Sequence, residues 1–162
     1  MRAFFISIAA VVTVLTAQVT PAEAASGTLT GKMANDNWLL GTSWSCTTKN
    51  VTAGKPARSG HATVTFDVAP GNVLHDRVSS TNFLLDEYSG FNSPSKAYWD
   101  VQADSTGSHT YATSADGNTY AGQFWDGNSS SKTTFTYAKA SSNELTVHQV
   151  SPGQTFDADC TR

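Results

Sequence analysis

The chain has 162 residues, of which 14% are charged, and its formal net charge at pH 7 is −3. This length suits one domain behind a short N-terminal segment. The weak acidity and the absence of any Lys- or Arg-rich run exclude an electrostatic basis for nucleic-acid binding, which depends on clustered positive charge.

The first 24 residues have the pattern of a secretory signal peptide. Met1 and Arg2 give a positive start, residues 3–17 are apolar, and Ala22-Glu23-Ala24 fits a cleavage site. These features together are typical of an export signal, and the apolar run is too short for a membrane-spanning helix. We expect a secreted or periplasmic domain of residues 25–162 that does not insert into the membrane, with an uncleaved N-terminal anchor as the alternative.

The remaining sequence consists of short β-type runs separated by turn signals. The triplets Asp116-Gly117-Asn118 and Asp126-Gly127-Asn128 are typical of tight hairpins. After a short turn at 34–37, we expect ten strands near 38–48, 61–68, 73–79, 82–91, 97–104, 108–113, 120–125, 133–138, 144–150 and 155–160. No composition break divides them, so the sequence predicts a single all-β domain.

Several of these runs alternate between apolar and polar residues. The apolar positions include Phe66 in the second run and Trp99 in the fifth. Because successive side chains of a strand point to opposite faces, each such strand has one dry face and one wet face. We therefore expect the apolar faces, Trp99 included, to point inward.

Cys46 and Cys160 are the two cysteines of the chain, one near each end of the expected domain. Each has the same parity as the apolar residues of its strand. In a closed up-and-down barrel the first and last strands are neighbours, at the Cα separation of about 5.5 Å that a disulfide needs. We expect an antiparallel up-and-down meander β-barrel of about ten strands closed by this disulfide. A β-sandwich with a similar bridge, or two free thiols, are the alternatives.

The third and fourth runs carry ionisable residues on both faces. His75 and Arg77 alternate with Asp76, and Asp86 alternates with Glu87. Whichever face points inward, at least one ionisable group goes with it, and burying such a group dry is costly. These residues either line a ligand cavity or lie at the open rim of the barrel, where they reach water. The rim is the interpretation that we favour from the sequence.

The candidate ligand-binding residues combine aromatic rings with charged groups on strand faces that could point inward. Aromatic side chains give an apolar ligand a large contact area, and a few polar groups orient it. Ordinary core packing is the alternative for the rings. The candidates are Trp44, Phe66, His75, Arg77, Trp99 and Phe135.

Motifs for metal, cofactor or covalent chemistry are lacking. The four histidines are far apart and form no zinc-binding pattern. His148 is a candidate axial ligand for an interior haem, with a surface histidine as the alternative; otherwise no cofactor is expected. The sequence has no nucleophile elbow, phosphate loop or dinucleotide fingerprint, so we assign no catalytic residue.

The nonapeptide Trp38-Leu39-Leu40-Gly41-Thr42-Ser43-Trp44-Ser45-Cys46 resembles the opening of calycin-type small barrels. Residues 90–99 and 115–120 resemble uncharacterised exported bacterial proteins of the same architecture. More distantly, the pattern is similar to nitrobindin-like and lipocalin-like barrels. The resemblance implies a meander barrel with an interior cavity for hydrophobic ligands, or for haem in nitrobindin-like members.

Three hypotheses for function follow. The first is a monomeric exported barrel that binds a small hydrophobic or amphipathic molecule inside it. The second is an acid–base enzyme of hydratase or isomerase type that uses His75 with Asp76 or Glu87 in the same cavity. The third is a protein-binding or inhibitory module that acts through a mobile loop at 49–59. The motifs favour binding over catalysis.

Overall fold

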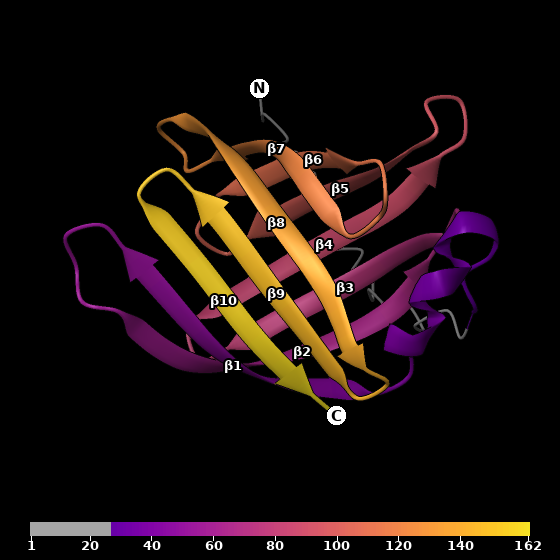
Figure 1. Cartoon of the computed structure of the whole chain (residues 1–162), viewed down its shortest axis with the longest axis horizontal. Coiled ribbons are helices and arrows are strands. Elements are labelled where there is room, and N and C mark those ends of the chain that lie inside the picture. The colour runs from indigo at the N-terminus through magenta and orange to yellow at the C-terminus, as the bar shows by residue number, and fades with distance from the viewer. Residues whose placement is uncertain (1–26) are drawn as a thin grey trace, which may run out of the picture.

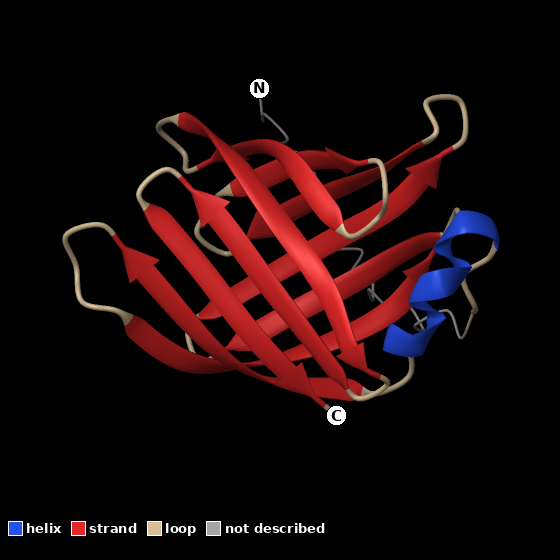
Figure 2. Ribbon diagram, in the orientation of Figure 1, coloured by secondary structure: helices blue, strands red, loops and turns tan. Residues whose placement is uncertain are grey.

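The computed structural model describes residues 27–162, which form a closed barrel of ten antiparallel strands preceded by one 3-10 helix (Figure 1, Figure 2). Each strand pairs with the next one along the chain, and β1 pairs with β10 to close the barrel. The expected signal segment lies outside the described residues. The elements are η1 (Gly31–Leu39), β1 (Ser43–Thr52), β2 (Arg58–Ala69), β3 (Val73–Ser80), β4 (Phe83–Asn92), β5 (Ala97–Asp104), β6 (His109–Ser114), β7 (Thr119–Trp125), β8 (Ser130–Ser141), β9 (Glu144–Ser151) and β10 (Gln154–Thr161).

The seam between β1 and β10 confirms the predicted closure. Cys46 lies opposite Cys160 in the strand register, and the two form a disulfide. Both cysteines are buried on the inner face of the wall, beside Trp44. The fold is therefore the predicted disulfide-closed meander barrel, and the β-sandwich alternative is wrong.

The first strand begins later than the sequence predicted. Trp38 and Leu39 belong to η1, where we expected only a short turn followed by a strand, and β1 starts at Ser43. Gly41, between the two elements, has a φ of 84°, a conformation that glycine adopts without steric cost. Trp38 and Leu39 thus belong to a helix that covers the barrel end, and they do not form part of the barrel wall.

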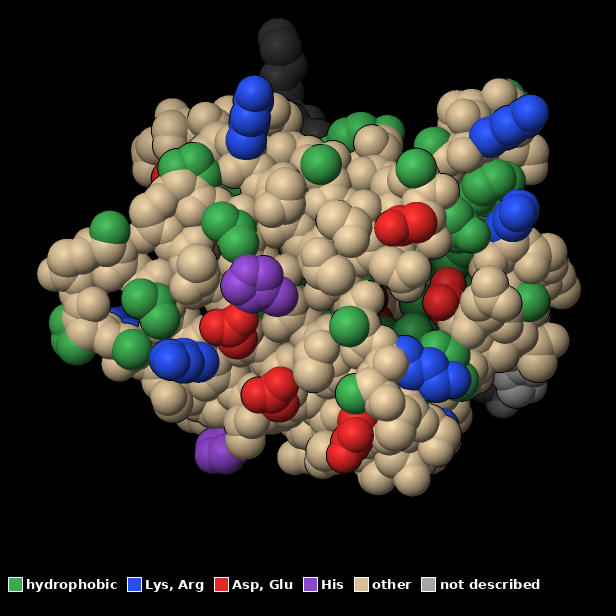
Figure 3. Space-filling model, in the orientation of Figure 1, with side chains coloured by type: hydrophobic (Ala, Val, Ile, Leu, Met, Phe, Trp, Pro, Cys, Tyr) green, Lys and Arg blue, Asp and Glu red, His purple; other side chains and the backbone are tan. Residues whose placement is uncertain are grey.

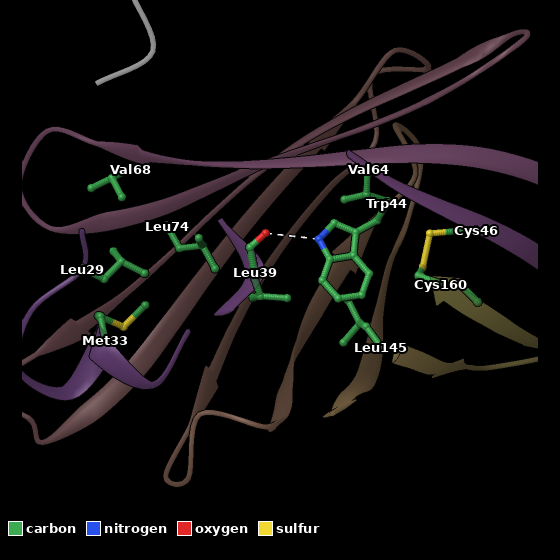
Figure 4. Close-up of a cluster of buried hydrophobic side chains, with 11 residues drawn as sticks. Leu29, Met33, Leu39, Trp44, Cys46, Val64, Val68, Leu74, Leu145 and Cys160 are labelled. Carbon is green, nitrogen blue, oxygen red and sulfur yellow. Dashed lines mark hydrogen bonds between the residues drawn. A yellow bond between two sulfur atoms is a disulfide. The ribbon is translucent and has the colours of Figure 1, made fainter. Parts of the chain in front are cut away.

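Helix η1 packs its apolar side into one end of the barrel. Met33 and Leu39 are buried in this end of the barrel, in one cluster with Trp44, Leu74 and Leu145 (Figure 4). The Trp44 indole Nε1–H donates to the Leu39 carbonyl at 3.1 Å, so the buried ring has a partner for its polar atom. Burial of these side chains fixes the helix on the barrel.

Two asparagines hold the chain around η1. The Asn37 side chain accepts from the Leu29 N–H at 2.7 Å and donates to the Leu29 carbonyl at 2.9 Å. The Asn72 side chain, in the β2–β3 turn, makes the same pair of bonds with the Thr30 backbone, at 2.7 and 3.1 Å. The Asn37 bonds brace the segment before β1, and the Asn72 bonds tie this segment to the barrel end where the cavity described below lies.

The segment at 49–59, expected to be a mobile loop, is mostly strand. β1 continues to Thr52 and β2 begins at Arg58, so a five-residue turn remains between them. Within the described chain, η1 is too short and too polar to span a bilayer.

Reduction of the disulfide should lower the free energy of unfolding by about 4–5 kcal/mol, because the bridge constrains a long loop of the unfolded chain. The two cysteines are 114 residues apart in the sequence. Guanidinium unfolding of the oxidised and the dithiothreitol-reduced protein measures the difference. Identical midpoints with identical slopes would contradict a stabilising role for the seam bridge.

Candidate functional site

A cavity of about 230 Å³ lies inside the barrel at the end that η1 covers. Figure 3 shows a recess in this region, where acidic, basic and apolar side chains meet next to the helix end of the molecule. The lining comes from η1, from the inner faces of β2, β3, β4, β8 and β9, and from the β6–β7 turn. The lining residues are Asn35, Asp36, Trp38, Leu39, Phe66, Leu74, Asp76, Glu87, Gly117, Asn118, Tyr137, Lys139 and Leu145.

The lining divides into apolar walls, an exposed rim and a buried floor. The walls are side chains of η1 and of the inner strand faces, chiefly Trp38, Phe66 and Leu145. The polar rim residues are exposed, among them Asn118 and Lys139. The floor is acidic and buried, and its chemistry sets what the cavity can bind.

Strand register brings the floor residues together. Asp76 of β3 lies directly opposite Glu87 of β4, and Glu87 lies opposite Gln102 of β5. Directly opposite residues on one face have Cβ atoms about 4.5–5.5 Å apart. Asp100, two residues before Gln102, shares the same inner face. The exposed fractions are 6% for Asp76, 4% for Glu87 and 0% for Asp100.

Glu87 is the best satisfied of the three carboxyls. The Tyr137 hydroxyl donates to its Oε1 at 2.5 Å, and Gln102 Nε2 donates to its Oε2 at 3.1 Å. Burial raises the pKa of Glu87, while the hydrogen bonds from Gln102 and Tyr137 lower it. Glu87 is thus the carboxyl that its surroundings equip to carry negative charge.

Asp100 is the carboxyl that its surroundings keep protonated. Neither of its oxygens has a hydrogen-bond partner among the described residues. Burial raises its pKa far above the usual range for an aspartate, and the neighbouring charge of Glu87 adds to the shift. A protonated, neutral Asp100 thus adds no second negative charge beside Glu87.

Asp76 is the carboxyl that faces the cavity. Burial raises its pKa well above the usual value, and the charges of Glu87, Asp86 and Asp67 add to the effect. Within residues 27–162, no donor satisfies its carboxyl, which lines the open space. A buried acceptor without a donor is costly unless water or a ligand meets it.

Three further titratable groups surround the floor. Asp36 of η1 lines the cavity, and burial raises its pKa to about 6. Lys139 lies at the rim with Nζ 4.6 Å from the centroid of the Trp38 ring. The rim ammonium thus contacts an aromatic face, as a cation–π pair. Burial also raises the pKa of Tyr137, which keeps its hydroxyl a neutral donor.

Three of the candidate ligand-binding residues lie inside the barrel. Phe66 lines the cavity. Trp44 is fully buried between η1 and β9, where it packs with Leu39 and Leu145. Phe135 belongs to a second buried cluster, where it stacks on Tyr120 at a centroid distance of 5.1 Å. Of the three, Phe66 contacts the cavity and the other two support the core.

His75 and Arg77 lie on the outer face of the barrel, because the inner face of β3 is formed by its even-numbered residues. His75 lies between Asp67 and Asp86, at 3.0 and 3.1 Å, and stacks on Tyr88. Arg77 Nε donates to Asp86 at 2.8 Å. Both residues belong to a surface ion-pair cluster, so neither can orient a ligand inside the barrel.

Trp99 also lies on the outer face, so the prediction that it points inward is wrong. The alternation of β5 was assigned to the wrong faces, because the inner face holds Asp100 and Gln102 and is polar. The Trp99 ring covers Gly90 on the neighbouring strand, where an added Cβ would lie 2.6 Å from the ring. The ring takes the place of a side chain on that strand.

His148 is exposed on the outer face of β9. Its Nδ1 lies 2.6 Å from Asp157 Oδ1, across the β9–β10 pair. The inner positions of this strand are Leu145, Val147 and Gln149. An interior haem cannot be ligated from this position. The described residues also bring no three His, Cys, Asp or Glu side chains together in an arrangement for a metal ion.

The acidic floor is the part of the site that sequence reasoning placed wrongly or missed. We predicted that the third and fourth strands each carry at least one ionisable group inward. Asp76 of β3 and Glu87 of β4 confirm this prediction. Their expected position at a solvated rim is wrong, since both are buried. The expectation that Trp99 points inward placed its neighbour Asp100 on the outer face, which is also wrong. A usable signal was Gly90, whose missing side chain leaves space for the Trp99 ring on the outer face.

Comparisons with known proteins identify no relative: no family model matches the sequence, and neither does any curated protein.

Replacing Tyr137 by Phe should destabilise the fold by about 1–3 kcal/mol, because it removes a donor from the buried Glu87 carboxyl. Tyr111→Phe is the matched control, since Tyr111 is 56% exposed and its hydroxyl reaches water. The control should stay within about 0.5 kcal/mol of wild type. Urea unfolding measures both; equal effects of the two substitutions would contradict the role of Tyr137.

The free energy of unfolding should fall as the pH rises from about 4 to 7. Burial raises the pKa of Asp76, Glu87 and Asp100 above the values of the unfolded chain. The folded state therefore binds more protons than the unfolded state in this window. Each buried carboxyl that stays protonated contributes a slope of about −1.4 kcal/mol per pH unit. Urea unfolding at a series of pH values measures the slope.

Below about pH 4 the sign reverses. Backbone N–H groups of Thr119 and Asn118 lower the pKa of Asp116 to about 2, so the stabilising effect of the Asp116 carboxylate is lost as the pH falls toward that value.

Asp36→Asn should remove part of the fall in unfolding free energy between about pH 4 and the Asp36 pKa of about 6. A wild-type stability that rises steadily from pH 5 to 7 would contradict the protonated floor.

Proposed function

We propose that this protein is an exported, monomeric barrel of calycin type that binds a small amphipathic molecule in the cavity beneath η1. One observation carries the proposal. The cavity combines apolar walls with polar groups that converge on its floor, which is the usual composition of a small-molecule site. The barrel architecture is compatible with this role.

The cavity volume limits the size of the ligand. A cavity of about 150 Å³ in another protein holds one benzene molecule. The cavity here, at about 230 Å³, is larger by about half. A single ring with a short polar chain, or an aliphatic molecule of similar size, fits this space.

The walls and the floor supply different contacts. Trp38, Phe66, Leu74 and Leu145 offer an apolar surface, so burial of the apolar part of a ligand contributes about 25 cal/mol per Å². The polar end of the ligand would meet Asp76, whose carboxyl has no donor among the described residues. The exposed rim residues give a route from solvent.

Acid–base catalysis in the same cavity is a second candidate. The observation that favours it is a set of adjacent carboxyls whose surroundings separate their proton affinities, with Glu87 equipped for charge and Asp100 held protonated. His75 takes no part, because it lies outside the barrel. Turnover of a bound molecule, abolished by Glu87→Gln, would establish this role. For the third hypothesis, a loop-mediated module, the short β1–β2 turn offers little surface.

Native mass spectrometry of the protein purified from its own host tests the binding proposal. We expect a co-purified small molecule that is lost in Phe66→Trp, because the larger ring fills the cavity. Thr65→Trp is the matched control, since it places the same ring one residue away on the outer face of β2, and it should keep the molecule. A wild-type protein that is empty, and that binds no molecule from an amphipathic panel by tryptophan fluorescence, would contradict the proposal.

A further inference from the structure

The floor of the cavity has acceptors in excess and no cation to match them. Three carboxyl groups line the cavity, those of Asp36, Asp76 and Glu87. Of the described lining residues, Lys139 is the one with a basic side chain, and its ammonium lies at the rim against Trp38. A buried carboxylate is stable when an opposite charge or several donors meet it.

Asp76 is an independent indication that something else fills this role. Its side chain is more than nine-tenths buried, lines the cavity and receives no hydrogen bond from the part of the chain that the structure describes. Its cross-strand neighbour Glu87 already accepts from Tyr137 and Gln102. Asp76 is therefore the floor carboxyl that presents free acceptors to the cavity.

The walls suit the apolar remainder of a cationic molecule. Trp38 and Phe66 present aromatic side chains to the space above the floor. An aromatic face attracts a cation as well as apolar groups, and Trp38 already attracts the Lys139 ammonium at the rim. A cation that enters the cavity would thus meet favourable surroundings along its path to Asp76.

We propose that the ligand of this cavity carries a protonated amine, which pairs with Asp76 and Glu87 while its apolar part lies against Trp38, Phe66 and Leu145. This inference rests on the proposed function and names the ligand class of the same site. An ammonium group supplies up to three N–H donors, which match the free acceptors of the floor. Charge-assisted hydrogen bonds of this kind are roughly twice as strong as neutral ones.

Binding of an ammonium should release protons from the floor. The titratable groups facing the site are Asp36 of η1, Asp76 of β3, Glu87 of β4, Asp100 of β5, Tyr120 of β7, and Tyr137 and Lys139 of β8. Burial raises the pKa of all four carboxyls, so the free site holds extra protons near neutral pH. A cation favours the ionised carboxyls, so affinity should rise with pH until the ligand amine itself loses its proton.

Isothermal titration calorimetry with matched amine–alcohol pairs tests the inference on the wild-type protein without its signal segment. The pairs are 2-phenylethylamine with 2-phenylethanol, benzylamine with benzyl alcohol, and hexylamine with hexanol. Each amine should bind about 10- to 100-fold more tightly than its alcohol, the factor expected for one or two hydrogen bonds to a charged group. Titrations in two buffers of different ionisation enthalpy should show proton release for the amines alone.

Substitutions assign the effect to the floor. Asp76→Asn and Glu87→Gln should each reduce amine affinity by about tenfold or more while alcohol affinity changes little. Asp159→Asn removes one exposed carboxylate from the outer face of β10 and should leave both affinities unchanged. Proton release by the wild-type protein needs no variant, so it decides the question even if a floor variant fails to fold.

The outcomes separate this inference from the proposed function. Alcohols that bind as tightly as their amines, with tryptophan fluorescence changing for both, would overturn the inference and leave the proposed function standing. Amine affinity that is equal in wild type, Asp76→Asn and Glu87→Gln would also overturn it. If no member of any pair binds, the proposed function fails for ligands of this size, and the inference fails with it.

Discussion

A closed ten-stranded barrel encloses more space than its own side chains fill, and the other features of this protein follow from that constraint. About eight strands give an interior just wide enough for side chains to fill or for one small ligand. Here ten strands leave room for η1 at one end and a cavity of about 230 Å³ beneath it. The Cys46–Cys160 bridge fixes the seam on which closure depends, and Trp44 beside it anchors η1 through its indole N–H.

The same excess of space explains how three carboxyls occupy the interior. A tightly packed apolar core could not solvate Asp76, Glu87 and Asp100, but strand register places them around an open volume with Tyr137 and Gln102 as donors. Burial and the neighbouring charge of Glu87 raise the pKa of Asp100 and keep it protonated, so the cluster avoids three adjacent negative charges. Asp76 remains with its acceptors toward the cavity. This arrangement costs stability, which is common at functional sites.

The sequence predicted the wall of the barrel better than its contents. Turn signals and the parity of Cys46 and Cys160 depend on local geometry, so the strand order and the bridge were predictable. The faces of β5 were not, because alternation assigns the apolar face to the interior, and this interior is polar. The 3-10 helix was missed because its apolar residues become informative only once a barrel end exists to receive them. Phe66 alone of the predicted ligand-binding residues lines the cavity.

A ¹³C NMR titration of the side-chain carboxyls, with Asp76, Glu87 and Asp100 assigned through Asn and Gln substitutions, is the most direct test of the protonated floor. All three should titrate well above the ordinary range of aspartates and glutamates, because burial raises their pKa, and Asp76 and Glu87 should shift toward the ionised form when 2-phenylethylamine is added. Titration of all three carboxyls in the ordinary range, unchanged by the amine, would show a water-filled interior and rule out a protonated floor that receives an ammonium.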